Sequence, residues 1–174
     1  IEKNLDSPIK VFSKIKNKKN TFFLEYIEGG EKWAQKSIIG LDCEDSIKVS
    51  DNKIEIKTAL GTSLIECKEP LNELNKLIAE YKTPVLDGMP RFYGGYVGFF
   101  AYESAKYAEN KINALQRKDS KFDVHMPDIY LVKSEKIIVY DNFNNSIQAV
   151  YNANPQKTSY EDALEIIEEI QNSI

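Results

Sequence analysis

The sequence is poor in the residues that most often carry catalysis and metal binding. It has one histidine, His125, and only two cysteines and two arginines among its 174 residues. A histidine-based triad or a multi-histidine zinc site therefore lacks its residues, and no HExxH, P-loop or GxSxG motif occurs. This inventory is typical of a binding or structural domain rather than a complete enzyme, so we predict no catalytic and no metal-binding residue in this chain.

The sequence also lacks long apolar runs and basic stripes. No segment approaches the roughly 18 apolar residues of a membrane helix, and the N-terminus has no signal-peptide core. Cys43 and Cys67 have no CxxC spacing, which predicts reduced thiols. The formal net charge is −4 with both signs interspersed. We therefore expect a cytoplasmic protein that binds neither nucleic acid nor membrane.

What the sequence does have is an ordinary globular composition, with 42 % hydrophobic and 29 % charged residues. The length favours a single domain over residues 1–174. Its most distinctive stretch is 90–103, which holds three of the eight glycines and has rings on both sides of Gly94-Gly95. Glycine lets another segment approach closely, so this stretch predicts a strand that bends where something large packs on it.

Hydrophobic patterning predicts mainly strands. Residues 46–49 and 53–58 alternate around Asp51-Asn52, which indicates a hairpin. A second antiparallel pair is expected between 128–133 and 136–141, and a turn at 142–145 leads to a returning strand at 147–151. Further strands are expected from β-branched and apolar content at 11–15, 21–27, 37–41 and 63–67.

Helices are predicted at two places. Leucines and isoleucines at three- and four-residue steps follow Pro70 and indicate a helix over 70–82. The C-terminal helix is expected to begin with a capping box of Thr158 and Glu161, with a short helix also possible over 103–108. Hairpins outnumber βαβ units, so we predict an α+β fold with mainly antiparallel sheets and packed helices.

One charge in the predicted strand 21–27 is a candidate for function. Glu25 lies among apolar and aromatic residues, and an unpaired carboxylate is costly to bury. It needs a protein partner or a ligand amine, unless the strand lies at an exposed edge.

Several segments together resemble the N-terminal domain of anthranilate synthase component I and of the related aminodeoxychorismate synthase component I. The stretch 90–99 is similar to the family's PRFxGGxVGY element, and Tyr102-Glu103 follows it as an aromatic–acid pair. Weaker similarities occur in the family's order over most of the chain, at the LLES strand (23–26), the Lys-Ser-apolar segment (36–39), the PD pair (127–128) and the VxxD strand (139–141).

The resemblance implies a function for a longer protein. The family's full chain converts chorismate into anthranilate and pyruvate with Mg²⁺ and ammonia from a glutamine amidotransferase subunit. Its catalytic and metal-binding residues belong to a C-terminal chorismate-binding domain, which residues 1–174 do not contain. We therefore expect this chain to be inactive alone, to hold no cofactor itself, and to have that domain and the amidotransferase as partners.

The resemblance also implies a site for L-tryptophan as a feedback effector. Leu24, Glu25, Tyr26 and Lys36 match the family's tryptophan-pocket elements, with Pro8 as a further member. A carboxylate suits the ligand's ammonium and apolar walls suit the indole. Tyr26 departs from the family, which has serine there, and its ring would fill the pocket, move it or weaken inhibition.

The glycine-rich strand has a different implied role. The resemblance assigns Phe92, Gly94, Gly95 and Gly98 to packing against the chorismate-binding domain. Without that domain, the apolar surface around 92–100 predicts weak self-association.

Two alternatives stay open. The chain fits the same domain of aminodeoxychorismate synthase, although the spacing from Glu25 to Lys36 favours the tryptophan pathway. It also fits a free-standing small-molecule binding module.

Overall fold

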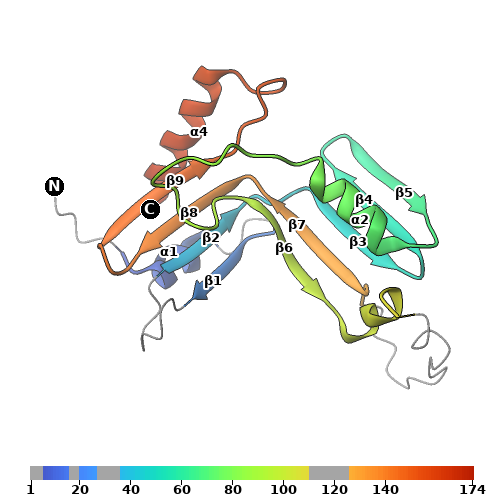
Figure 1. The fold of residues 1–174 in the computed structure, drawn as a ribbon. Coiled ribbons are helices and arrows are strands. Elements are labelled where there is room, and N and C mark those ends of the chain that lie inside the picture. The colour runs from blue at the N-terminus through green and yellow to red at the C-terminus, as the bar shows by residue number, and fades with distance from the viewer. Residues whose placement is uncertain (1–5, 16–19, 27–35, 110–125) are drawn as a thin grey trace. The chain divides into compact units, whose positions relative to one another are not determined.

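The computed structural model describes residues 6–15, 20–26, 36–109 and 126–174, and it confirms the α+β class (Figure 1). Two compact units form. Unit 1 comprises Ile1–Cys43, Thr83–Gly95 and Ser134–Ile174, and unit 2 comprises Glu44–Lys82 and Tyr96–Lys133. Each unit has its own antiparallel sheet.

Unit 1 is built on a four-stranded sheet with the order β1-β2-β8-β9. Neighbouring strands are antiparallel, with Ile39 of β2 opposite Ile138 of β8. Strands were predicted at all four places, and the bounds are Phe22–Tyr26 (β1), Lys36–Leu41 (β2), Lys136–Asp141 (β8) and Ser146–Tyr151 (β9).

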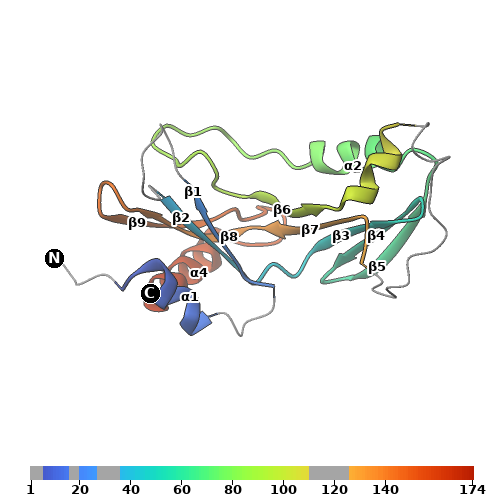
Figure 2. The same ribbon diagram turned by 90° about the horizontal axis from the view of Figure 1, so that it is seen from below.

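Helices α1 (Pro8–Ile15) and α4 (Tyr160–Asn172) pack on one face of this sheet (Figure 2). Val11, Ile15 and Ile170 join residues of β2 and β8 in one buried cluster. The prediction of a strand at 11–15 is wrong, because Val11 and Ile15 lie four residues apart on the same side of a helix.

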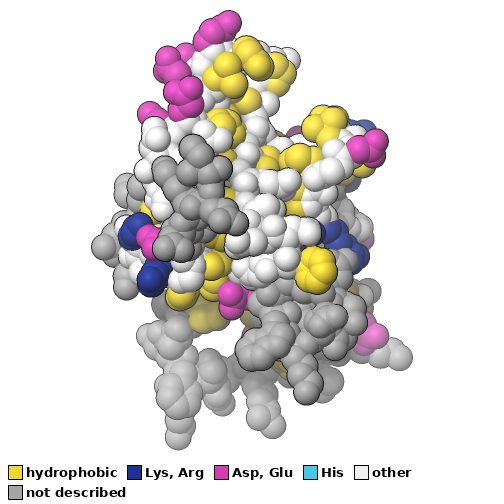
Figure 3. Space-filling model, turned by 90° about the vertical axis from the view of Figure 1, so that its left-hand side faces the viewer, with side chains coloured by type: hydrophobic (Ala, Val, Ile, Leu, Met, Phe, Trp, Pro, Cys, Tyr) yellow, Lys and Arg dark blue, Asp and Glu magenta, His cyan; other side chains and the backbone are white. Residues whose placement is uncertain are grey.

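The start of α4 corrects another prediction. Ser159 rather than Thr158 is the N-cap, and its hydroxyl accepts a hydrogen bond from the backbone N–H of Asp162 at 3.1 Å. The helix meets the sheet through Ile166 and Ile170. Five acidic side chains of α4 are exposed: Glu161, Asp162, Glu165, Glu168 and Glu169. Figure 3 shows acidic side chains gathered at the top of the molecule, where α4 lies in Figure 1.

The opposite face of the four-stranded sheet is covered by the segment 83–95. Phe92 and Tyr93 pack on a second cluster formed by Ile38, Ile137 and Val139. The Tyr93 hydroxyl donates to the carbonyl oxygen of Pro84 at 2.9 Å. The central strands of unit 1 are thus packed on both faces.

Unit 2 contains a five-stranded sheet with the order β5-β4-β3-β7-β6. The predicted hairpin is confirmed, with Val49 opposite Ile54 and Ile47 opposite Ile56. The strands span Ser46–Ser50 (β3), Lys53–Thr58 (β4), Gly61–Glu66 (β5), Gly95–Phe100 (β6) and Ile129–Ser134 (β7).

Helix α2 (Pro70–Ala79) packs on one face of the five-stranded sheet through Leu74. A 3-10 helix, η1 (Tyr102–Tyr107), is tied to the start of β7: Lys106 Nζ lies 2.9 Å from an Asp128 carboxylate oxygen, and the Tyr107 hydroxyl donates to the same carboxylate. Across the described ranges, no helix combines the length and the hydrophobicity needed to cross a bilayer.

The predicted pairing of 128–133 with 136–141 is wrong. β7 pairs with β3, with Leu131 opposite Ile47, whereas β8 pairs with β2 and β9. Glu135 alone separates the two strands, and even the tightest hairpin has a two-residue loop. The chain passes directly from one sheet to the other.

Candidate functional site

A chain of polar side chains crosses from β1 to the β8–β9 turn in unit 1. Glu25 lies opposite Ser37 in the β1–β2 register. The Ser37 hydroxyl donates to Glu25 Oε1 at 3.2 Å and accepts from Asn142 Nδ2 at 3.3 Å. Ser37 is fully buried, and its hydroxyl both donates and accepts a hydrogen bond within the protein.

Glu25 itself is exposed because β1 is an edge strand. The edge alternative considered for this residue is therefore correct, and no desolvation penalty needs to be offset. A buried serine donates to one carboxylate oxygen of this exposed residue. This arrangement can accept hydrogen bonds from an incoming cation.

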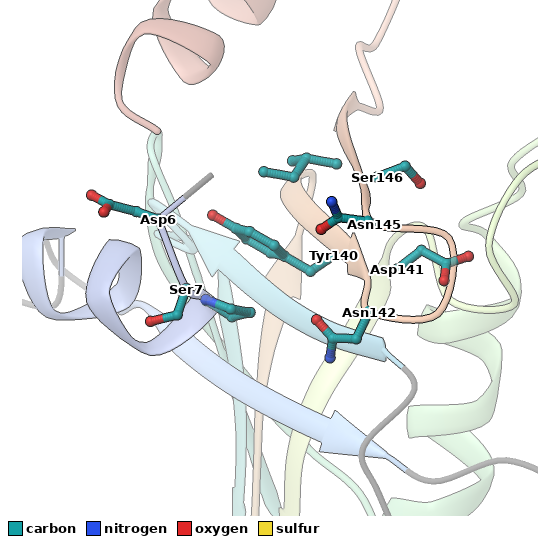
Figure 4. A pocket seen from close by; sticks show the side chains of 9 residues that line it. Asp6, Ser7, Tyr140, Asp141, Asn142, Asn145 and Ser146 are labelled. Carbon is teal, nitrogen blue, oxygen red and sulfur yellow. The ribbon is translucent and has the colours of Figure 1, made fainter. Parts of the chain in front are cut away.

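Pro8 lies on the same face of the sheet as Glu25. It begins α1, which packs on β2 and β8 with Ile39 and Tyr140. It also lines a small cavity of about 90 Å³ beside Asn142, at the end of the polar chain from Glu25 (Figure 4). The structure thus brings Pro8 and Glu25 to one face through Ser37 and Asn142.

Leu24, Tyr26 and Lys36 lie on the other face, because successive side chains of a strand point to opposite sides. The Tyr26 ring packs in the cluster with Ile38 and Val139, and its hydroxyl is buried without a partner among the described residues. Leu24 is 41 % exposed. The five residues predicted for the tryptophan site are therefore divided between two faces that meet at the β1 edge.

Lys36 is opposite Asp141 in the β2–β8 register. The pKa of Asp141 lies below its usual value, chiefly because the carboxylate accepts a hydrogen bond from the backbone N–H of Asn144. It also accepts from the Asn144 side-chain amide and the Phe143 N–H, and the charge of Lys36 lowers the pKa further. Asp141 stays ionised and fixes the turn that carries Asn142.

The residues predicted for domain packing have neighbours within the chain. Phe92 packs in unit 1. A Cβ on Gly94, whose φ is +148°, would lie 2.3 Å from the Asn152 amide nitrogen, which donates to the Tyr93 carbonyl at 2.6 Å. A Cβ on Gly98 would lie 1.9 Å from the Tyr130 carbonyl oxygen. Gly95 needs a φ of +122°, which favours glycine.

Ser37, Tyr140 and Asn142 were not among the predicted site residues. The sequence could have indicated Ser37, since it is the only hydroxyl residue in the apolar strand after Lys36. Nothing in the sequence indicated Asn142, because its role depends on the pairing of β2 with β8, which are distant in the chain. His125, the single histidine of the sequence, lies outside the described residues.

Metal binding was tested against the residues that the structure describes. They include no group of three or more His, Cys, Asp or Glu side chains that could hold an ion. The Mg²⁺ implied for the longer enzyme therefore finds no ligand set in the described part of this chain. Burial raises the pKa of the Cys43 thiol to about 11, which makes it a poor nucleophile.

Comparison with known proteins agrees with the resemblance. No family model matches. Anthranilate synthase component 1 of Pseudomonas aeruginosa is 33 % identical over 169 residues, which cover 96 % of this chain and 34 % of the relative. The protein of the same name from Neisseria meningitidis serogroup B is 32 % identical over 174 residues, covering 98 % and 35 %.

The fold comparison leads to a related protein. The crystal structure of anthranilate synthase component I from Streptococcus pneumoniae superimposes with a TM-score of 0.62 at 22 % identity, covering 95 % of this chain and 34 % of that one. The chain spans about a third of the length of the curated relatives it matches. It therefore belongs to the anthranilate synthase component I family, as a counterpart of the N-terminal domain.

Proposed function

We propose that this domain contributes the N-terminal half of an L-tryptophan feedback site to a longer anthranilate synthase component I. In that protein a chorismate-binding domain would hold Mg²⁺ and convert chorismate into anthranilate and pyruvate, using ammonia from a glutamine amidotransferase subunit. The observation that carries the proposal is the exposed Glu25 carboxylate, oriented by the buried Ser37 hydroxyl at 3.2 Å.

The proposed ligand would lie along the β1 edge, where Leu24 on one face and Glu25 on the other are exposed. Glu25 would accept hydrogen bonds from the tryptophan ammonium. On the other face, Leu24 would contact the indole and Lys36 would face the ligand carboxylate, with Tyr26 packed beneath them. Pro8 would close the site at the start of α1.

The test uses the longer protein, with ammonia as the nitrogen source so that the amidotransferase is not required. Glu25→Gln should raise the tryptophan concentration for half-inhibition about 10- to 100-fold, because one charge-assisted contact is lost. Glu55→Gln changes a half-buried strand glutamate of unit 2, and this matched control should leave inhibition unchanged. Equal inhibition of wild type and Glu25→Gln would refute the proposal.

A second variant tests position 26. Tyr26→Ser restores the family's residue but removes a ring that packs with Ile38 and Val139. It should alter tryptophan inhibition, because Leu24 and Lys36 flank the space that the ring leaves. If inhibition is the same before and after the change, Tyr26 does not shape the site.

We further propose that β6 packs against the chorismate-binding domain. Support comes from its place at one edge of the five-stranded sheet and from its lack of charged residues, since edge strands exposed to water usually carry such protection. Phe99 and Phe100 are 37 % and 56 % exposed. Adding that domain should cover them.

Sedimentation of this chain at several concentrations tests the packing proposal. The exposed strand should cause concentration-dependent self-association, which Phe100→Lys should reduce. Leu60→Lys is the control, because Leu60 is 92 % exposed at a turn away from β6. A monomer at every concentration would contradict the proposal.

Aminodeoxychorismate synthase is the second candidate, since it shares the N-terminal elements quoted above. The relatives compared here carry the anthranilate synthase name, which favours the first candidate. Identifying the product that the longer protein forms from chorismate would separate the two.

A further inference from the structure

A cavity in unit 1 lies between the start of α1 and the β8–β9 turn, at the Asn142 end of the polar chain from Glu25. Its volume is about 90 Å³, and Figure 4 shows side chains from both elements facing it. The lining comprises Asp6, Ser7, Pro8, Tyr140, Asp141, Asn142, Asn145, Ser146 and Ile147.

Tyr140 is the unusual member of this lining. It is 4 % exposed, and its hydroxyl has no hydrogen-bond partner among the described residues. The hydroxyl points toward Asp6 across the cavity (Figure 4). Because buried polar atoms are nearly always paired, this hydroxyl is a group that a ligand can satisfy.

The charge of the lining indicates which ligand. Two carboxylates and several neutral oxygens face the cavity, and no lysine, arginine or histidine belongs to the lining that the described residues form. Asp141 is occupied by the turn. Asp6 Oδ2 accepts from Lys14 Nζ at 2.6 Å, which leaves its second oxygen for another donor.

The helix end does not reverse this preference. An N-terminus favours anions through its free N–H groups. In α1, however, Pro8 has no N–H, and the N–H groups of Lys10 and Val11 both donate to the Ser7 carbonyl. An anion would also meet the carboxylates of Asp6 and Asp141, although Lys14 pairs with the first and the charge of Lys36 acts on the second.

Tyr140 keeps its proton at neutral pH. Burial, and secondarily the negative charge of Asp6, raises the pKa of Tyr140 to about 12. The neutral hydroxyl has lone pairs that can accept from a cation beside Asp6.

We propose that this cavity binds the primary ammonium group of a small amine, with the Tyr140 hydroxyl and Asp6 as acceptors and the amide oxygen of Asn145 beside them. The volume holds a head group, because pockets for whole ligands are several times larger. The cavity shares Pro8 with the proposed tryptophan site, but Glu25 does not line it, so the proposal does not depend on tryptophan inhibition.

The probe is methylammonium chloride, titrated into the isotopically labelled chain and followed by the side-chain amide signals of Asn142 and Asn145 in NMR spectra. We expect saturable shifts in wild type. Tyr140→Phe should weaken the affinity about tenfold, as expected for one lost hydrogen bond. Asp6→Asn should weaken it as well, and it is a second variant that does not alter the core.

Tyr26→Phe is the matched control, because it removes another buried hydroxyl without a partner, from the opposite face of the same sheet. It should leave methylammonium binding unchanged. Three results would overturn the proposal: equal shifts with sodium chloride, saturable binding of sodium acetate instead, or wild-type affinity in both Tyr140→Phe and Asp6→Asn.

Discussion

The two sheets differ in how many of their faces are covered. In unit 1, residues Ser37–Leu41 of β2 and Ile137–Tyr140 of β8 are all buried. In unit 2, β3 and β4 bury Val49 and Ile54 but leave Lys48 and Glu55 toward water. Among the residues that the structure describes, helices and the 83–95 segment cover the first sheet on both sides, whereas α2 covers the second on one side.

The residue patterns of the strands reflect this difference in packing. A strand packed on both faces has a continuous apolar run, and a strand packed on one face alternates. β2 and β8 have the first pattern, while β3 and β4 have the second. A substitution should therefore have a large effect at every central position of unit 1 but only at alternate positions of unit 2.

The largest effects should come from neighbouring core residues. Ile137→Ala and Ile138→Ala should each lower the free energy of unfolding by about 2–5 kcal/mol, because the two side chains lie in different buried clusters. Ile54→Ala should cost a similar amount, whereas Glu55→Ala should change stability by about 0.5 kcal/mol or less. Urea denaturation measures all four, and a negligible loss for either Ile137→Ala or Ile138→Ala would contradict two-sided packing.

The next effect concerns a glycine in each sheet. Gly98→Ala should cost about 1–3 kcal/mol, because its Cβ would meet the backbone of Tyr130, which cannot yield without breaking the β6–β7 pairing. Gly40→Ala should cost less, since its Cβ would meet the Phe22 ring, which can rotate. Amide exchange in β7 and denaturation curves test the order. The reverse order would show that the Phe22 ring is the more rigid neighbour.

The smallest effect concerns the helices that cover the sheets. Ser159→Ala should cost about 0.5–2 kcal/mol, because α4 loses its side-chain cap. Glu69→Ala should cost less, since α2 begins at Pro70 with no side-chain cap hydrogen bond. Thr158→Ala serves as a control beside the true cap, and a larger loss there than at Ser159 would contradict the assignment of the N-cap.

Sequence patterns predicted elements wherever local chemistry determined them. The β3–β4 hairpin follows from alternation around Asp51-Asn52, both of which adopt positive φ. The sequence patterns gave a wrong prediction at 11–15. Val11, Ser13 and Ile15 also fit the alternation of a strand, but packing on β2 stabilises a helix there. The pairing of β7 and β8 failed because partners for both strands lie far away in the chain.

The candidate site likewise has a part that the sequence predicts and a part that depends on distant pairing. Glu25 and its position on a strand were visible in the sequence, and so was the absence of a cationic partner nearby in the strand. Its hydrogen bond to Ser37 follows from the register of β1 with β2. Asn142 and Tyr140 depend on the pairing of β2 with β8 and on α1, so a single sequence could not reveal them.

The pairing of β2 with β8 has a consequence for synthesis of the chain. Ser37 and Asn142, which are hydrogen-bonded, are 105 positions apart. During synthesis, the edge of β2 that pairs with β8 therefore has no partner until β8 has been made. Strands β3, β4 and β5 follow one another and can pair as soon as they are made. We expect the interval before β8 appears to be the period when nascent chains aggregate most readily.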